Sequence, residues 1–266
     1  MDSKSTAHAD TRGIGSRLQP FGAVLLDLDG VLTPTAEVHR AAWRATFDAL
    51  LATAPPGGQV DTRPFSDDDY RNLVDGKSRE DGVRAFLASR HITLAERDPD
   101  DSPTAETVQG IGNRKNAAVL ALLEDEPLDA YPDSVALVNK LREREIPMAV
   151  VSASRNCSAV LAAAGLGGLF DAQVDGEVAA RLGLAGKPSP DTFLAAADLL
   201  GVTPKDCVVI EDAIAGVAAG RAGRFGLVVG VARSDNEEAL REAGADLIVS
   251  DLSELLDAGA DQVGSR

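Results

Sequence analysis

The hydrophobic residues of the chain fall into short apolar runs that alternate with amphipathic stretches. The runs are rich in Val, Ile and Leu and lie at 21–28, 147–152, 206–210, 225–231 and 245–249. Such runs are typical of strands buried in a parallel sheet. Helical patterns lie between them at 133–145, 156–164, 190–200 and 213–222. The alternation predicts an α/β fold with a Rossmann-like core, whose central parallel sheet is flanked by helices on both faces.

One long stretch departs from this alternation. Between residues 36 and 124 no convincing strand pattern occurs, and helical patterns lie at 36–52, 67–74, 78–89 and 114–123. The polar segments near 54–68 and 92–108 are interpreted as surface excursions rather than as loops over a site. The stretch predicts an all-helical domain inserted after the first strand. The expected division is a disordered leader at 1–19, a core at 20–33 and 127–258, an inserted domain at 34–126 and a C-terminal tail at 259–266.

The charge balance restricts the possible partners. The 266 residues carry a formal net charge of −16, which disfavours nucleic acids and anionic membrane surfaces. The sequence has no run of about 18 apolar residues, so no membrane span is expected. The polar N-terminus lacks the apolar segment of a signal peptide. We therefore expect a cytoplasmic monomer. Cys157 and Cys207 fit no metal-binding spacing and are expected to be small buried hydrophobic residues.

The first candidate for chemistry follows the first predicted strand, where Asp27, Asp29 and Gly30 lie close together. Ligands of parallel α/β sheets bind beyond the carboxyl ends of the strands, and Gly30 allows a sharp turn there. Two such carboxylates could divide the work of nucleophile and proton carrier. Taken alone, the pattern also fits a solvated loop.

Two further segments could bind phosphate. Residues 151–156 end another apolar run and open a helix, so that small hydroxyl side chains and backbone N–H groups could face an anion. A plain helix N-cap is the alternative. Lys187 stands in a loop bracketed by Gly and Pro, which could aim its ammonium group at one point. A surface lysine is the alternative there.

Acids at a second strand end suggest a cation site. Glu211 and Asp212 follow the run at 206–210, in a sheet whose first strand already ends in acids. Carboxylate oxygens are ligands that suit Mg²⁺. A helix N-terminus, which also favours acids, is the alternative. A protein this acidic repels phosphates, so a phosphorylated substrate would need such a metal or a local group of cations.

The joint order of these motifs is more specific than any one of them. Four motifs, each at the end of a predicted strand, resemble those of the haloacid dehalogenase-like superfamily of phosphotransferases, over about residues 21–256. The helical insertion lies where that superfamily has its cap domain. Segments at 27–39, 75–81, 113–116, 151–156, 186–193 and 211–220 further resemble the β-phosphoglucomutase family. That family interconverts β-glucose 1-phosphate and glucose 6-phosphate, so the resemblance implies a hexose phosphate as partner.

The resemblance implies roles for the core residues. Asp27 is the expected nucleophile, which forms an aspartyl-phosphate, and Asp29 is the expected general acid and base. Mg²⁺ would be held by Asp27, the main-chain carbonyl of Asp29 and Asp212, with Glu211 reaching it directly or through water. The transferring phosphoryl group would be bound by Lys187, Ser152, Ala153 and Asn156, with Arg155 as a supporting charge.

In the helical insertion the resemblance implies substrate contacts. Arg79 and Lys115 would hold the phosphate that is not transferred, His39 would position the general acid, and Thr35 would lie at the hinge. Arg79 also fits the start of a capped, solvated helix, and a lone helical His is more often a surface residue. Pro34 departs from the family pattern, which is commonly acidic at this position, and its fixed φ predicts a stiffer hinge.

Three functions stay open at this point. A β-phosphoglucomutase returns the phosphoryl group to a sugar, a phosphatase passes it to water, and a silent binding module of the same fold does neither. The cap segments at 75–81 and 113–116 favour the mutase, whereas many phosphatases share the core motifs. The acids and lysine of the core together disfavour the silent module. No G-x-x-x-x-G-K-[ST] sequence occurs, and the three histidines are too scattered for a zinc site.

Overall fold

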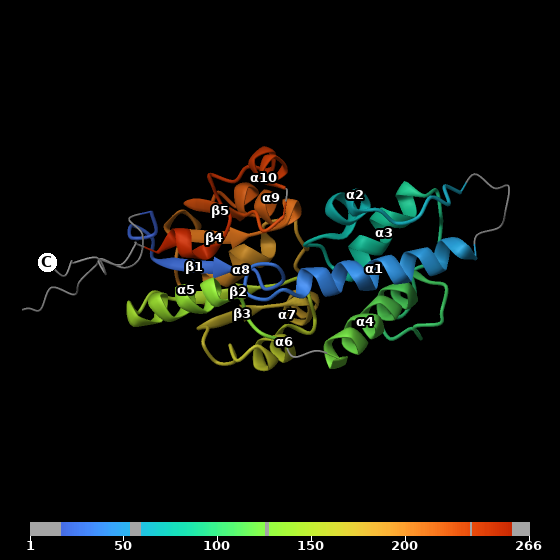
Figure 1. Cartoon of the computed structure of the whole chain (residues 1–266), viewed down its shortest axis with the longest axis horizontal. Helices are drawn as coiled ribbons and strands as arrows, with labels where there is room; N and C mark the ends of the chain where they lie inside the picture. The colour runs from blue at the N-terminus through green and yellow to red at the C-terminus, as the bar shows by residue number, and fades with distance from the viewer. Residues whose placement is uncertain (1–16, 54–59, 126–127, 235, 257–266) are drawn as a thin grey trace, which may run out of the picture.

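A parallel sheet organises the larger part of the molecule. The computed structural model describes residues 17–53, 60–125, 128–234 and 236–256 (Figure 1). Within them, six parallel strands form one sheet in the order β3-β2-β1-β4-β5-β6. They are β1 (Ala23–Leu26), β2 (Met148–Val151), β3 (Ala172–Val174), β4 (Cys207–Glu211), β5 (Leu227–Val231) and β6 (Leu247–Val249). Leu26 pairs with both Val150 and Ile210, so the carboxyl ends of β1, β2 and β4 lie together.

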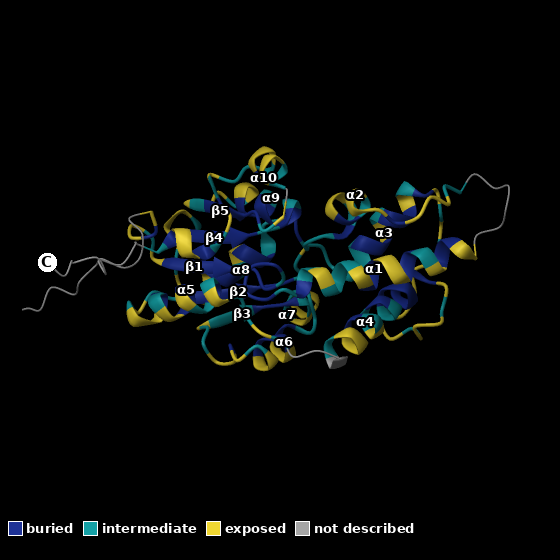
Figure 2. Ribbon diagram, in the orientation of Figure 1, coloured by how far each residue is buried: buried dark blue, intermediate teal, exposed yellow. Residues whose placement is uncertain are grey.

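Helices cover both faces of this sheet, because successive side chains of each strand point to opposite sides. Val24 and Leu26 pack on α5 (Pro132–Glu143) and α6 (Cys157–Ala163). Ala23 and Leu25 belong to the opposite cluster, which contains buried side chains of α8 (Asp191–Leu199), α9 (Ile214–Ala222) and α10 (Glu237–Ala243). A further helix, α7 (Gly176–Leu182), follows β3. The central strands β1, β2 and β4 are wholly buried in this sandwich, whereas the edge strands β3 and β6 are buried only in part (Figure 2).

The remaining helices form a second cluster, here called the helical part. It comprises α1 (Thr35–Ala52), α2 (Asp67–Asp69), which continues as a π-helical turn (Tyr70–Val74), α3 (Arg79–Ser89) and α4 (Val108–Asp125). Phe47 stacks on Trp43 at 4.8 Å and on Phe86 at 3.8 Å between ring centroids, within an apolar cluster of its own. The helical part lies beyond the carboxyl ends of the strands (Figure 1).

The predicted α/β class is confirmed, and the differences are local. The apolar pattern misses β3, which has three residues, only one of them fully buried, and it misses α7 and α10. Helix α4 begins at Val108, earlier than predicted, within a segment interpreted as a surface excursion. Leu18, placed in the predicted leader, is buried in the core, whereas residues 1–16 and the predicted tail at 259–266 lie outside the described residues. The domain boundaries stay a prediction.

No helix in the described ranges combines the length and the apolar character that crossing a membrane requires.

Candidate active site

A buried lysine joins two acids at the carboxyl ends of the central strands. Lys187 Nζ lies 2.5 Å from Asp27 Oδ1 and 2.6 Å from Glu211 Oε1, and it donates to the Val151 carbonyl at 3.0 Å. The side chain is only 2% exposed, yet each of its three ammonium protons has an acceptor within the protein. Asp27 follows β1 directly and Glu211 ends β4, so the sheet register itself brings these groups together. The pKa of Lys187 is raised, because the attraction of Asp27 and Glu211 outweighs the cost of burial.

Three acids form a cluster that fits a hard cation. Asp27, Glu211 and Asp212 each offer an oxygen within 4.8 Å of the others. Burial and mutual repulsion raise the pKa of both Asp27 and Asp212. Gly30, in the turn that follows Asp29, packs directly against the side chain of Asp212. Its φ is +86°, and a Cβ at this position would lie 1.8 Å from Asp212 Oδ2, so no larger residue fits. A divalent cation would relieve the repulsion, and oxygen donors of this kind are those that Mg²⁺ prefers.

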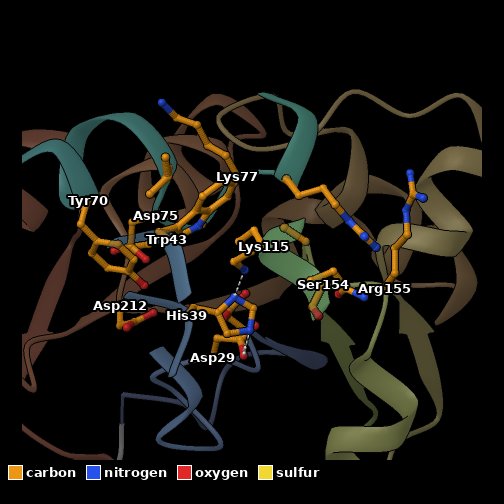
Figure 3. Close-up of a pocket in the computed structure, with 17 residues that line it drawn as sticks. Asp29, His39, Trp43, Tyr70, Asp75, Lys77, Lys115, Ser154, Arg155 and Asp212 are labelled. Carbon is orange, nitrogen blue, oxygen red and sulfur yellow. Dashed lines mark hydrogen bonds and ion pairs between the residues drawn. The ribbon is translucent and has the colours of Figure 1, made fainter. Parts of the chain in front are cut away.

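Asp29 is linked to the helical part through a chain of polar contacts. Thr35 Oγ1 donates a hydrogen bond to Asp29 Oδ1, and His39 Nε2 lies 3.5 Å from the same oxygen. Lys115 Nζ lies 2.7 Å from His39 Nδ1 (Figure 3). Burial, aided by Lys115, lowers the pKa of His39 to about 4, so its ring is neutral near pH 7. While Lys115 is charged, its ammonium group can only donate, so Nδ1 accepts from Lys115 and Nε2 carries the proton that faces Asp29.

The two cations predicted to grip a second phosphate line the same cavity as the acids. Arg79 and Lys115 share its lining with Asp27, Asp29 and Asp212. Burial lowers the pKa of Lys115 to about 7 and also lowers that of Arg79. Neither cation is neutralised by a direct carboxylate contact of its own in the described residues, so both can meet an incoming anion.

The predicted phosphate cradle is reproduced in part. Ser152 is buried, accepts a hydrogen bond from the Ser154 N–H at 3.0 Å and lies 3.4 Å from Asp29, while Ala153 lines the cavity. Asn156 does not line this cavity, because its amide is donated to Asn116 of α4 at 2.8 Å.

Arg155 does line the cavity, but its charge is partly taken up elsewhere. Its Nη2 lies 3.0 Å from Glu80 Oε1 in the helical part. This ion pair ties the loop after β2 to the start of α3. The supporting charge predicted for Arg155 stays a prediction.

Sequence reasoning missed the acid at the roof of the cavity. Asp75 follows the π-helical turn and lines the cavity, on the same side as Tyr70 and Asp212 in Figure 3. Burial raises the pKa of Asp75 to about 7. Trp43 and Lys77 also line the cavity, and neither of them was assigned to the site from the sequence. Asp75 opens the segment at 75–81 on which the family resemblance rests, and this was the signal that could have identified it.

Comparisons with known proteins identify the family to which the chain belongs. The haloacid dehalogenase-like hydrolase family model matches residues 21–224. A beta-phosphoglucomutase of Mycobacterium tuberculosis is 48% identical over 238 residues, which are 88% of this chain and 91% of that protein. The beta-phosphoglucomutase of Bacillus subtilis is 35% identical with the same coverage. The crystal structure of a beta-phosphoglucomutase from Clostridium difficile aligns with a TM-score of 0.69 at 27% identity, covering 88% of this chain and 93% of that one.

The chain therefore belongs to the haloacid dehalogenase-like hydrolases, and within them to the β-phosphoglucomutase family. It is an enzyme of phosphoryl transfer, as the sequence predicted.

The pKa of Lys115 predicts a pH dependence of substrate binding. Above about pH 7 the free enzyme loses this positive charge, so kcat/KM for a sugar phosphate is expected to fall as the pH rises. Lys115→Arg should shift the fall to higher pH, because a guanidinium stays charged. Asp75 titrates in the same range, so Asp75→Asn is the control and should keep the fall. Identical kcat/KM profiles for Lys115→Arg and the wild type would contradict this assignment.

Proposed function

We propose that the chain is a β-phosphoglucomutase, which interconverts β-D-glucose 1-phosphate and D-glucose 6-phosphate through an aspartyl-phosphate on Asp27 and a hexose bisphosphate intermediate. The observation that carries the proposal is the Lys187 bridge between Asp27 and Glu211, beside Asp212 and near Arg79 and Lys115 of the helical part. The 48% identity to curated β-phosphoglucomutases supports the choice of reaction.

In the proposed reaction Asp27 is the attacking group. Its carboxylate oxygen would form a bond to phosphorus while the bond from phosphorus to the leaving oxygen breaks. Lys187 would compensate charge on the phosphoryl oxygens, and the buried Ser152 would supply a hydroxyl at the base of the cradle. Mg²⁺, held by Asp27, Asp212 and the carbonyl of Asp29, would neutralise charge on the transferring group. Glu211 already accepts from Lys187 and from the Ala213 N–H, which favours an indirect role toward the metal.

Asp29 would carry the proton. It would give a proton to the leaving sugar oxygen in one half-reaction and take one from the attacking hydroxyl in the other. Thr35 and the neutral His39 each offer a hydrogen-bond donor to its carboxylate, which fixes the orientation of the group. Both residues lie on α1, so the helical part would align the proton carrier when it closes as a cap.

The helical part would also decide between sugar and water. A mutase has to exclude water from its phospho-enzyme until a sugar hydroxyl arrives. Arg79 and Lys115 would bind the second phosphate of the bisphosphate and so hold the cap closed around it. The ion pair of Arg155 with Glu80 and the contact of Asn156 with Asn116 are further links between core and cap.

Product analysis tests the proposal. The enzyme is incubated with β-glucose 1-phosphate, Mg²⁺ and a trace of the 1,6-bisphosphate, and glucose 6-phosphate and free phosphate are both measured. We expect glucose 6-phosphate to predominate. Free phosphate as the main product would favour a phosphatase, and no product from a folded protein would favour a silent binding module.

Replacing Arg79 separates binding of the second phosphate from the chemical step. Arg79→Ala is expected to raise KM for β-glucose 1-phosphate by about 30-fold or more, because a partly buried charge that meets phosphate is lost. Hydrolysis of p-nitrophenyl phosphate, which has no second phosphate, should change little. Arg71→Ala is the matched control, since Arg71 pairs with Asp68 on the surface of the helical part. Equal losses on both substrates would place Arg79 outside substrate recognition.

The phosphatase is the second candidate, because a specific residue favours it. Pro34 stands directly before α1, where φ is −76° and ψ is 24°, and it offers no N–H to the hinge. A cap that closes less completely would admit water to the phospho-enzyme.

The cytoplasmic location and the monomeric state of the protein stay predictions.

A further inference from the structure

The loop after β5 contacts both acid-bearing loops of the site, although it carries none of the recognised motifs. Arg233 Nε donates to the Gly30 carbonyl at 2.9 Å, and its Nη2 lies 3.3 Å from the Val31 carbonyl. Asn236 Nδ2 donates to the Asp212 carbonyl at 3.1 Å. One loop therefore binds the turn that follows Asp29 and also the chain at Asp212.

Arg233 is itself held rigidly from a fourth segment. Its Nη2 donates to Asp133 Oδ2 at 2.7 Å, and its guanidinium lies 3.7 Å from the centroid of the Tyr131 ring. Asp133 is fixed in turn, since the Leu252 N–H donates to the same carboxylate oxygen at 2.7 Å. The planar guanidinium thus meets a carboxylate, two carbonyls and an aromatic face at once, a combination that a lysine cannot reproduce.

The two braced loops touch each other at the acidic cluster. The position of a Cβ at Gly30 would be 1.8 Å from Asp212 Oδ2, so the loops approach as closely as a glycine allows. At this point Asp27, Glu211 and Asp212 each offer an oxygen within 4.8 Å of the others, so three acids are held close together. Repulsion between like charges drives such loops apart, and contacts from outside the cluster are needed to oppose it.

We infer that Arg233 and Asn236 are positioning residues, which set the separation between the turn at Asp29–Gly30 and Asp212 and thereby the affinity of the cluster for a divalent cation. Neither residue touches the reacting atoms. The inference rests on the proposed function only in that the acidic cluster binds such a cation. Outer contacts of this kind typically alter metal affinity by about 10–100-fold.

The test is the dissociation constant of Mg²⁺, measured by calorimetry without sugar, together with the melting temperature of each metal-free variant. Arg233→Met is expected to weaken Mg²⁺ binding by about 10–100-fold. Arg233→Lys should recover part of the affinity. Asn236→Ala should weaken Mg²⁺ binding by a smaller factor than Arg233→Met. If Arg233→Met fails to fold, the result for Asn236→Ala decides the test.

Two control variants separate positioning from general destabilisation. Arg90→Met removes another buried ion pair, with Asp69 at 2.6 Å, and Asn72→Ala removes another amide-to-carbonyl bond, to Asp68 at 2.8 Å. Both controls should lower the melting temperature and leave the Mg²⁺ affinity unchanged. The inference would be overturned if the Mg²⁺ affinity were unchanged in Asn236→Ala and also in Arg233→Met, provided that the latter folds. It would also be overturned if the wild-type protein bound no Mg²⁺. A wild-type protein that binds Mg²⁺ but releases free phosphate would contradict the mutase alone.

Discussion

Replacing Asp27 with Asn is expected to lower kcat by about four orders of magnitude or more, because the amide cannot form the aspartyl-phosphate. The substitution keeps the size of the side chain and removes a carboxylate whose pKa is raised by burial and by Glu211 and Asp29. The folded protein should remain intact, because Lys187 keeps its partner Glu211 at 2.6 Å. The measurement is steady-state turnover of β-glucose 1-phosphate, together with the melting temperature.

Asp171→Asn is the matched control for Asp27→Asn. Asp171 lies before β3, at the opposite end of the strands, where its carboxylate accepts from the Met148 N–H at 2.8 Å. This variant should keep its turnover. An Asp27→Asn enzyme with near wild-type activity would rule out Asp27 as the nucleophile.

Replacing Lys187 with Met is expected to have the largest effect on stability. The substitution leaves Asp27 and Glu211 buried and unpaired, a loss that typically costs about 3–5 kcal/mol in free energy of unfolding. Catalysis should fail as well, since the charge beside the phosphoryl group is gone. Denaturant unfolding measures the free energy, and the double variant with Glu211→Gln should recover part of it, because one of the two unpaired charges is then removed.

The stability loss in Lys187→Met should depend on pH in a defined direction. An acid whose folded-state pKa is raised binds more protons in the folded than in the unfolded state, so its cost is full above the folded pKa and shrinks as the pH falls. Without Lys187, Asp27 belongs to this class, since burial raises its pKa. The deficit is expected to be larger at about pH 8 than at about pH 5. A deficit that grows in acid would show that the ion pair is not its cause.

The arrangement of the core could be predicted because its signals are local. Apolar runs define the strands, and in a parallel sheet the residue after each run must lie at the same edge. This reasoning was enough to place Asp27 at the same edge as Glu211 and Asp212. For Lys187 it predicted only that the ammonium group could be aimed at one point, and the structure places that group between Asp27 and Glu211. The order of the motifs then identified the family.

What the sequence could not predict depends on contacts between distant segments. Asn156 belongs to a phosphate motif, but its amide is taken by Asn116 of α4, which no local pattern reveals. Asp75 lies at the cavity because the π-helical turn ends just before it. Arg233 has no motif around it, and its link to Gly30 exists only because β5 packs beside β4, which in turn lies next to β1. The short strand β3 lacks the apolar run by which the others were found.

If the phosphoryl group passes through Asp27, the aspartyl-phosphate can be trapped chemically during turnover. The enzyme is mixed with the hexose 1,6-bisphosphate and Mg²⁺, quenched in acid within one turnover and treated with borohydride, which reduces an acyl phosphate to an alcohol. Peptide mass spectrometry then locates the reduced residue. Reduction is expected at Asp27, and it should require the bisphosphate and be absent from Asp27→Asn. Reduction at another acid, or a fully active enzyme in which no residue is reduced, would contradict this role of Asp27.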